Sequence, residues 1–226
     1  IFNARSKLVT CHIELKHLAL SFSWKTYHKQ IFQDLNLCID QGSYVTIIGA
    51  NGSGKSSLVK LLLGLIPPDE GDVIIHGEPV KPGYPDGVRQ GRLSYLSQQI
   101  EELFFADTVR EELTHKQSIT LEGINIQYLE SLGLSDHLER SIESLSGGER
   151  QALALAGFMG NRSDLLLLDE PSSYLDQDRA AVLKTYLHES QLAGKTILHV
   201  TQYPSEVKWG THLIDLNQSD VKVVTL

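Results

Sequence analysis

Short apolar segments alternate with amphipathic stretches along most of the chain, at the lengths expected of strands and helices. Strand-like segments lie at 12–20, 44–49, 72–77, 92–97, 164–169, 195–200 and 211–216. Because strands that alternate with helices usually form a parallel sheet, this pattern predicts an α/β fold. Four consecutive leucines at 165–168 are typical of a central strand that is buried on both faces.

The middle of the chain follows a different periodicity. Apolar residues recur there at helical intervals, namely Ile126, Leu129, Leu132, Leu134, Leu138 and Ile142. This spacing predicts a mainly helical insertion, after which the α/β pattern resumes. We therefore expect one domain over 1–226, with a β-rich core at 1–97 and 155–226 and a helical subdomain at 98–154.

Negative charge is concentrated in this helical segment. The chain has a net charge of −8, and residues 97–150 hold eleven acidic against four basic side chains. Nucleic acids are bound chiefly by cationic side chains, so this balance argues against a DNA or RNA partner.

We find no signal peptide and no apolar run near the ~20 residues that span a bilayer, so we expect membrane association only through another chain. Because the chain begins without methionine, we expect a trimmed or excised piece of a longer protein.

The two cysteines, Cys11 and Cys38, have neither the number nor the spacing of a disulfide framework or a zinc site. We expect both to be reduced thiols. Nine histidines are scattered without the spacing of metal ligands, and we assign no role to His12 beside Cys11.

The segment GANGSGKSS at 49–57 matches the phosphate-loop pattern GxxxxGK[ST], between a predicted strand and an amphipathic helix. Glycines let backbone amides turn inward and the helix N-terminus adds partial positive charge, so the segment predicts a cradle for a triphosphate. Lys55 is expected to bridge the β- and γ-phosphates, and the Ser56 hydroxyl to bind Mg²⁺. A chance glycine-rich turn would not explain the flanking strand and helix. The predicted ATP-binding residues are Gly49, Ala50, Asn51, Gly52, Ser53, Gly54, Lys55, Ser56 and Ser57.

The segment LLLLDEP at 165–171 ends an apolar strand in two carboxylates. At the carboxyl end of a strand in an α/β sheet, Asp169 can reach the coordination shell of Mg²⁺. Glu170 can then orient an attacking water or accept its proton. An apolar run that ends in Asp-Glu also arises without function, and the phosphate loop is what favours the catalytic interpretation.

The segment LSGGERQ at 145–151 predicts a helix start with Ser146 as the cap and Glu149 completing a capping box. A well-capped helix is the simpler interpretation. However, Ser146, Gly147 and Gly148 also form a second amide-rich helix N-terminus, which is a second phosphate site. One nucleotide needs only one such site, so the second is explained if it serves a nucleotide held by another subunit.

At this point the chain resembles the nucleotide-binding subunits of ABC ATPases, from about residue 13 to the end. Five motifs occur in the family's order: the phosphate loop, a Q-loop at Gln98, the signature LSGGERQ, the acidic strand end, and a D-loop SSYLD at 172–176 that contains Asp176. The resemblance implies a P-loop NTPase fold, with a RecA-like core sheet, N-terminal antiparallel β elements and an inserted helical signature subdomain. It also implies a head-to-tail dimer in which Ser146, Gly147, Gly148 and Glu149 of one subunit face the ATP of the other.

The same resemblance assigns further roles. It makes Gln98 a Mg²⁺ ligand and a catalytic residue, and it places Trp24 where an aromatic side chain stacks on adenine. The segment YLSQQIEELFFADTVREEL at 95–113 is similar to the Q-loop region of energy-coupling-factor and cobalt/nickel importers. It departs from that pattern at Gln99 and Ile100, where Asn-Pro is common, and a solvated acidic loop would explain the glutamates equally well.

The last core strand ends in VTQ, where the family pattern has VTH. Gln202 thus stands in place of a histidine that reaches the γ-phosphate, and it keeps an amide donor and a carbonyl acceptor. His199 cannot replace it, because it lies three residues earlier and is expected in the sheet. The retained Lys55, Gln98 and Glu170 favour an active site, but a slow site in a heterodimer fits as well.

The sequence therefore predicts an ATPase subunit of an ABC importer for a metal ion or a vitamin, with ATP and Mg²⁺ as cofactors. Its expected partners are a second ABC ATPase subunit, identical or different, and an integral membrane transporter subunit that holds it at the cytoplasmic face of the membrane. One alternative is a slow or inactive ATP-gated dimerisation subunit of a heterodimeric complex. A soluble ABC ATPase outside transport is another.

Overall fold

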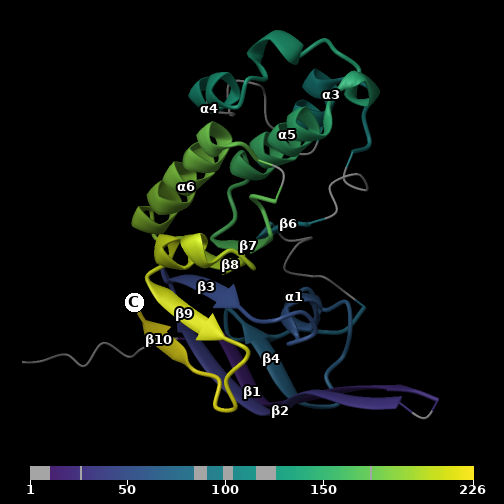
Figure 1. Cartoon of the computed structure of the whole chain (residues 1–226), viewed down its shortest axis with the longest axis vertical. Helices are drawn as coiled ribbons and strands as arrows, with labels where there is room; N and C mark the ends of the chain where they lie inside the picture. Colours follow the sequence, from purple (N-terminus) through teal and green to yellow (C-terminus); the bar gives the residue numbers. More distant parts are fainter. Residues whose placement is uncertain (1–10, 26, 84–90, 99–103, 116–125, 174) are drawn as a thin grey trace, which may run out of the picture.

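A six-stranded sheet forms the centre of the fold in the computed structural model of the chain (Figure 1). Its order is β10-β9-β3-β8-β7-β6, and all neighbours are parallel except β10, which is antiparallel to β9. These strands are β3 (Tyr44–Ile48), β6 (Leu93–Leu96), β7 (Leu165–Asp169), β8 (Thr196–Val200), β9 (His212–Asp215) and β10 (Val223–Thr225). The predicted α/β fold with a parallel sheet is confirmed.

The structure describes the chain apart from certain segments and side chains. The segments are 1–10, 26, 84–90, 99–103, 116–125 and 174, and the side chains are those of Trp24, Tyr27, His115, Ile126 and Gln127.

A second sheet is antiparallel, in the order β2-β1-β4-β5, which confirms the expected N-terminal antiparallel elements. Its strands are β1 (Cys11–Trp24), β2 (Tyr27–Asp40), β4 (Glu70–Ile75) and β5 (Glu78–Pro79). The sequence pattern did not predict β2, β5 or β10. In β2, residues 35–40 alternate between buried and exposed, and the alternation is interrupted at Gln33 and Asp34, where the pairing with β1 shifts register.

Two apolar cores lie on opposite faces of the six-stranded sheet. Leu165 and Leu167 of β7 belong to the core shared with the antiparallel sheet and with α1 (Lys55–Leu62). Leu166 and Leu168 belong to the core under α5 (Gly147–Met159) and α6 (Gln177–Leu192). Because successive strand residues face opposite sides, a strand between two cores must be apolar throughout. The four leucines are fully buried, and β7 lies second from the edge of the sheet.

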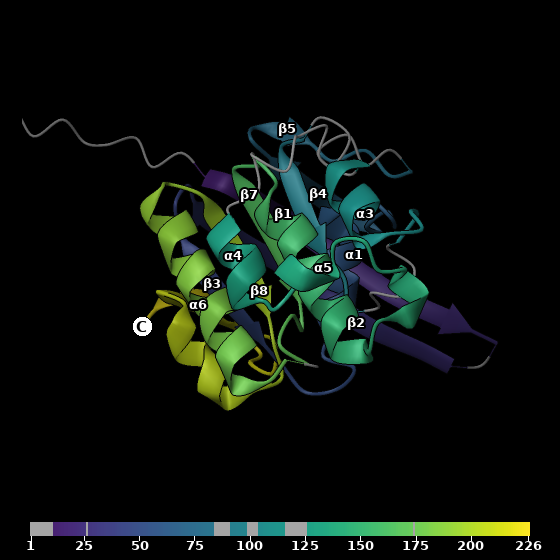
Figure 2. The same ribbon diagram turned by 90° about the horizontal axis from the view of Figure 1, so that it is seen from above.

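Helical elements cover the second core, and Figure 2 shows α4, α5 and α6 over the core sheet. The insertion contains α3 (Val109–His115), α4 (Ile126–Ser131) and two 3₁₀ turns, η3 (Ser135–His137) and η4 (Ile142–Ser144). Gly133, with φ of 72°, lies just beyond α4 and permits the turn that ends it. The expected boundary at residue 154 falls inside α5, and the division into subdomains stays a prediction.

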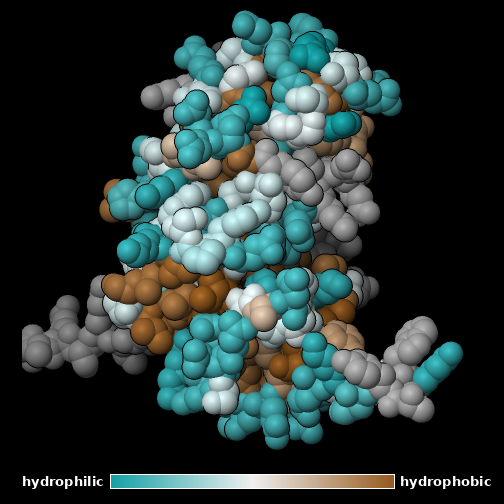
Figure 3. Space-filling model, viewed as in Figure 1, coloured by the Kyte–Doolittle hydropathy of each residue, from teal (hydrophilic) through white to brown (hydrophobic). Residues whose placement is uncertain are grey.

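Hydrophilic side chains cover most of the helical part in Figure 3, and an apolar patch lies lower, on the side where the C-terminus emerges. The longest described helix, α6, has 16 residues. No helix within the described part of the chain has the length and apolar character needed to cross a membrane.

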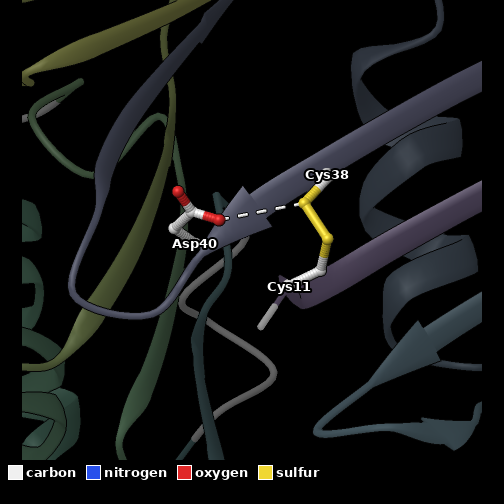
Figure 4. Close-up of side chains that lie close together, drawn as sticks. All are labelled: Cys11, Cys38 and Asp40. Carbon is white, nitrogen blue, oxygen red and sulfur yellow. Dashed lines mark hydrogen bonds between the residues drawn. A yellow bond between two sulfur atoms is a disulfide. The ribbon is translucent and has the colours of Figure 1, made fainter. Parts of the chain in front are cut away.

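The expectation of two reduced cysteines is wrong, because Cys11 and Cys38 form a disulfide (Figure 4). The antiparallel pairing of β1 with β2 brings their Cα atoms to 5.4 Å, although they are 27 positions apart in the sequence. This proximity comes from strand pairing, so the spacing of the two cysteines alone could not reveal it.

We expect the substitution Cys38→Ser to lower the free energy of unfolding by about 3 kcal/mol under non-reducing conditions, because the disulfide restricts the unfolded chain. Urea unfolding monitored by circular dichroism measures this difference. Reductant should destabilise the wild-type chain to a similar extent and leave the Cys38→Ser chain unchanged. Equal midpoints for all four samples would contradict a stabilising disulfide.

Candidate functional site

Four parallel strands of the core sheet end at the same edge. Val200 of β8 pairs with Ile47 of β3 on one side and with Asp169 of β7 on the other. Leu96 of β6 pairs with Leu168 of β7. Ligands of open parallel sheets bind at the carboxyl ends of the strands, so the segments that follow these strands build the candidate site. They are the phosphate loop after β3, Gln98 after β6, Asp169 and Glu170 at the end of β7, and Gln202 after β8.

The phosphate loop turns from β3 into α1, as predicted. Gly52 and Gly54 have φ values of 78° and 106°, which glycine adopts without steric cost. A Cβ atom at Gly54 would lie 2.7 Å from Ile31 and 2.8 Å from Phe32, so the loop packs tightly on β2. Lys29 of β2 donates from Nζ to the Gly52 carbonyl at 2.8 Å. Sequence reasoning missed this lysine, because β2 itself was not predicted.

Lys55 and Ser53 point into the turn of the loop. The buried Lys55 Nζ donates to the carbonyl oxygens of Gly49 at 2.5 Å and Ala50 at 3.2 Å. Ser53 Oγ is buried and has no hydrogen-bond partner among the described residues. A Cβ atom at Gly49 would lie 2.2 Å from this oxygen. A cation, an unsatisfied hydroxyl and an amide-rich turn at a helix N-terminus fit the triphosphate of ATP.

The loop is also held by the turn that follows β9, the strand next to β3. Ala50 donates its N–H to Asn217 Oδ1 at 2.7 Å, and Asn217 in turn donates to Asp215 Oδ1. Hydrogen bonds from Asn217 and Gln218 lower the pKa of the Asp215 carboxyl, which stays ionised and anchors this turn. Asn217 therefore positions the loop, and nothing in its local sequence signals that role.

Three oxygen donors were predicted for Mg²⁺, from Ser56, Gln98 and Asp169. Ser56 and Gln98 are exposed, whereas Asp169 is buried at the strand end. The pKa of the Asp169 carboxyl is raised to about 6, chiefly by burial and then by the charge of Glu170, while Lys55 acts in the opposite direction. A cation beside Asp169 would favour its ionised form. Hydroxyl, amide and carboxylate oxygens are donors that Mg²⁺ prefers, so this set fits the ion.

Glu170 is the point on which the amide side chains of the site converge. Gln202 Nε2 donates to Glu170 Oε2 at 2.9 Å, and Gln98 Nε2 lies 3.4 Å from the same oxygen. Ser173 Oγ donates to the Glu170 carbonyl at 2.9 Å and reaches Oε2 at 3.4 Å. The substituted Gln202 is thus directed at the carboxylate predicted to act on water.

The backbone of Glu170 has an uncommon conformation. Its φ is 49°, in the left-handed region that a glutamate rarely adopts. The Glu170 N–H donates to the Val200 carbonyl at 2.9 Å, which ties the turn to β8. Strain of this kind persists where surrounding contacts enforce it, and it is found mainly at functional sites.

A buried polar network lies directly behind Gln202. His199 is fully buried on β8, which confirms that it cannot take the place of the missing histidine. Its Nε2 lies 3.2 Å from Glu206 Oε2, and the same carboxylate accepts hydrogen bonds from Thr201 Oγ1 at 2.6 Å and from Ser172 Oγ. Burial by itself would raise the pKa of Glu206, but the hydrogen bonds from His199, Ser172 and Thr201 outweigh it and the pKa is lowered.

Glu206 lies on η5 (Pro204–Trp209), so this network joins three segments that flank the site. Sequence reasoning missed it because the partners meet only in the folded chain.

The signature segment starts α5, as predicted. Ser146 caps the helix, and its Oγ accepts a hydrogen bond from the Glu149 N–H at 3.3 Å. Glu149 completes the capping box, because its Oε2 accepts from the Ser146 N–H at 2.7 Å. The hydrogen bonds from Ser146 lower the pKa of Glu149 to about 2, and Arg140 lies 3.2 Å from it. Ser146 and Gly147 are exposed. Gln151 is buried and donates to the Pro171 carbonyl at 3.0 Å, which links this helix to the turn that follows Glu170.

Asp176 caps α6 through the Arg179 N–H at 2.8 Å, a structural role for this predicted D-loop residue. Trp24 ends β1, but its side chain is outside the described part, so stacking on adenine stays a prediction. Tyr174 of the D-loop, and Gln99 and Ile100 of the Q-loop, also lie outside the described residues.

Comparisons with known proteins identify the family of the chain. A family model described as ABC transporter matches residues 32–173. Energy-coupling factor transporter ATP-binding protein EcfA1 of Fusobacterium nucleatum is 32% identical over 210 residues, which cover 90% of this chain and 78% of that protein. EcfA2 of Methanospirillum hungatei is 33% identical over 202 residues, which cover 82% of this chain, while the chain spans about half (48%) of that relative.

Solved structures show the same fold. The ATP-binding cassette MJ0796, a dimer in a post-hydrolysis state bound to ADP and Pi, has a TM-score of 0.78 at 24% identity, covering 93% of this chain and 96% of that one. CbiO1 of Clostridium perfringens, part of the ABC transporter complex CbiONQ, has a TM-score of 0.73 at 19% identity, covering 95% and 87%. The chain belongs to the ABC transporter ATP-binding family, whose members bind ATP and couple its hydrolysis to transport.

Proposed function

We propose that this chain binds ATP with Mg²⁺ and hydrolyses it to drive an importer. The observation that carries this proposal is the convergence of Gln202, Gln98 and Ser173 on the Glu170 carboxylate, beside a complete phosphate loop. A buried strand end that only stabilised the fold would not need a strained glutamate held by three polar side chains.

Each group has a role that follows from its chemistry. The amides of 49–57 and the Lys55 ammonium would hold the phosphates of ATP. Ser56, Asp169 and Gln98 would hold Mg²⁺, which when bound neutralises charge on the phosphate oxygens. Glu170 would orient the attacking water and accept its proton, so that a P–O bond to water forms as the bond to ADP breaks.

Gln202 would hold Glu170 in position. An amide donor at 2.9 Å fixes one carboxylate oxygen and leaves the other for water. Removing a hydrogen bond to a charged group costs about 1.5–3 kcal/mol, which corresponds to a rate loss of about 10- to 100-fold if it acts on the transition state. Gln202 therefore keeps a hydrogen-bond donor at this position, directed at Glu170, but lacks the ability of a histidine to carry a proton.

A second subunit would complete the site. Ser146 and Gly147 are exposed at the start of α5, where the helix N-terminus offers amides to an anion. The capping box already turns the Glu149 carboxylate back onto Ser146, so its negative charge is engaged within its own chain. In a head-to-tail pair with an identical or different ABC subunit, these amides would face the partner's γ-phosphate.

A membrane subunit would bind beside the Q-loop. Phe105 is 82% exposed there and borders a hollow with Ala106, Asp107, Glu111 and Thr114. An exposed aromatic side chain at a hollow is the kind of anchor that dominates protein interfaces. The names of the energy-coupling factor transporter relatives support a role in transport. On the resemblance of the Q-loop region we propose an importer for a metal ion or a vitamin, with this chain at the cytoplasmic face of the membrane.

A second candidate is a slow or inactive subunit that binds ATP and pairs with a more active partner. The observation in its favour is Gln202 at the position of the usual histidine. A soluble ABC ATPase outside transport would instead show no dependence on a membrane partner.

We expect Glu170→Gln to retain ATP binding and to lower Mg²⁺-dependent phosphate release by roughly 10²- to 10⁴-fold, the usual contribution of a general base. The matched control is Glu70→Gln, at an exposed position on β4. Steady-state phosphate release and equilibrium binding of a fluorescent ATP analogue measure the two effects. A wild-type chain that releases no phosphate, alone or with its co-purified partners, would contradict the proposal.

We expect Gln202→Ala to slow hydrolysis by about 10- to 100-fold, because it removes the amide donor to Glu170. Gln202→His should keep the rate within a few-fold or raise it, since a ring N–H can donate to the same oxygen. Single-turnover kinetics on both variants test this pair. A collapse of the rate in Gln202→His, with Gln202→Ala unaffected, would show that Gln202 does not act through this hydrogen bond.

We expect Phe105→Ala to weaken binding to the membrane protein that co-purifies with the wild-type chain by about tenfold, because it removes an exposed aromatic anchor. Basal ATP hydrolysis should stay unchanged. Leu192→Ala is the control, at a 75% exposed apolar side chain at the end of α6. Affinity measured in detergent or nanodiscs reports the difference, and equal losses for both variants would argue against a docking site at Phe105.

A further inference from the structure

Two histidines and an aspartate meet at the end of the core sheet opposite the phosphate loop. His12 lies on β1, His76 lies in the turn between β4 and β5, and Asp164 immediately precedes β7. Leu165, the first residue of β7, pairs with Thr196, the first residue of β8. The cluster is therefore at the amino ends of these strands, away from the carboxyl ends that build the nucleotide site.

The donor atoms of these side chains have the separations expected of metal ligands. His12 Nε2 lies 3.2 Å from His76 Nε2, and His76 Nε2 lies 3.4 Å from Asp164 Oδ1. One ligand atom from each residue lies within 4.8 Å of the others. Two ligand atoms that each lie about 2.0–2.1 Å from a tetrahedral ion are about 3.3 Å from one another. The His12–His76 and His76–Asp164 separations match this value.

Hydrogen bonds cannot satisfy all three of these donor atoms at once, whereas a bound cation can. His76 Nε2 carries at most one hydrogen, yet both His12 Nε2 and Asp164 Oδ1 face it. Asp164 Oδ1 is buried and, within the described structure, accepts no hydrogen bond. A buried carboxylate oxygen without a hydrogen bond is costly, and one ion between the three atoms would satisfy all of them.

The surroundings hold both imidazoles in a state that can bind a metal. His12 Nδ1 lies 2.5 Å from Thr196 Oγ1, so this nitrogen can carry the hydrogen and leave the Nε2 lone pair toward the cluster. The backbone N–H of His76 donates to the His12 carbonyl at 2.9 Å, which fixes the turn next to β1.

We propose that His12, His76 and Asp164 bind a first-row transition-metal ion of the Zn²⁺ class, with a water as the fourth ligand. Two imidazoles and one carboxylate are a ligand set that suits such ions and not Mg²⁺. The ion would link the antiparallel sheet, through His12 and His76, to the core sheet, through Asp164. This site is independent of the nucleotide site and of the proposed transport activity.

Zn²⁺ binding to the intact, nucleotide-free chain tests the proposal. Zn²⁺ is titrated into the chain in competition with a chromogenic chelator, and excess Mg²⁺ occupies sites made only of oxygen ligands. Reductant is left out, so that the disulfide keeps Cys11 and Cys38 from binding Zn²⁺ as thiolates. We expect one Zn²⁺ per chain. Co²⁺ in place of Zn²⁺ should give the intense visible absorption of a tetrahedral site, and Zn²⁺ should raise the temperature of unfolding.

Two variants and a control locate the ion. His76→Asn removes the imidazole but suits the φ of 54° at this position, and Asp164→Asn keeps the shape of the side chain. Each should weaken Zn²⁺ binding by about tenfold or more and remove the Co²⁺ spectrum, while His188→Asn, at an exposed position on α6, should change neither. Absence of stoichiometric Zn²⁺ binding, or binding unchanged in both variants, would overturn the proposal and leave a hydrogen-bonded histidine pair.

Discussion

The parallel register of β3, β8, β7 and β6 is the constraint on which the rest of the structure depends. It aligns Ile47, Val200 and Asp169 side by side, so that the segments leaving these strands open on one edge. The register is stabilised because β7 is apolar on both faces and lies between two cores, where a shift by one residue would exchange the sets of leucines. The phosphate loop, the two carboxylates at the end of β7 and the amide side chains after β6 and β8 therefore lie together, each within a few residues of its strand.

Within that edge, Gln202 contacts the Glu170 carboxylate. Gln202 supplies a neutral donor, so it can hold the carboxylate without adding positive charge near the phosphates. The left-handed backbone of Glu170, tied to Val200, keeps the carboxylate where this donor can reach it. The buried pair of His199 and Glu206 lies next to the same turn, and Glu206 joins its two sides through Ser172 and Thr201.

Short contiguous motifs were predictable and contacts between distant segments were not. The phosphate loop, the acidic end of β7 and the capping box of α5 each depend on residues within a few positions of one another, which local patterns can show. The disulfide, Lys29 and the cluster of His12 with His76 and Asp164 depend on how β1 and β2 pair with the rest. β2 was not among the predicted strands although its residues 35–40 alternate, and the contacts that β2 makes were missed with it.

We propose that one ATP site forms at the carboxyl edge of this sheet, with Gln202 acting on Glu170. A crystal structure of the wild-type chain with Mg²⁺ and a non-hydrolysable ATP analogue tests it most directly. We expect phosphates inside the loop at 49–57, Mg²⁺ beside Ser56 and Asp169, and Gln202 Nε2 within hydrogen-bond distance of Glu170 or the γ-phosphate. Phosphates bound outside the loop, or a Gln202 side chain turned away from both groups, would contradict it.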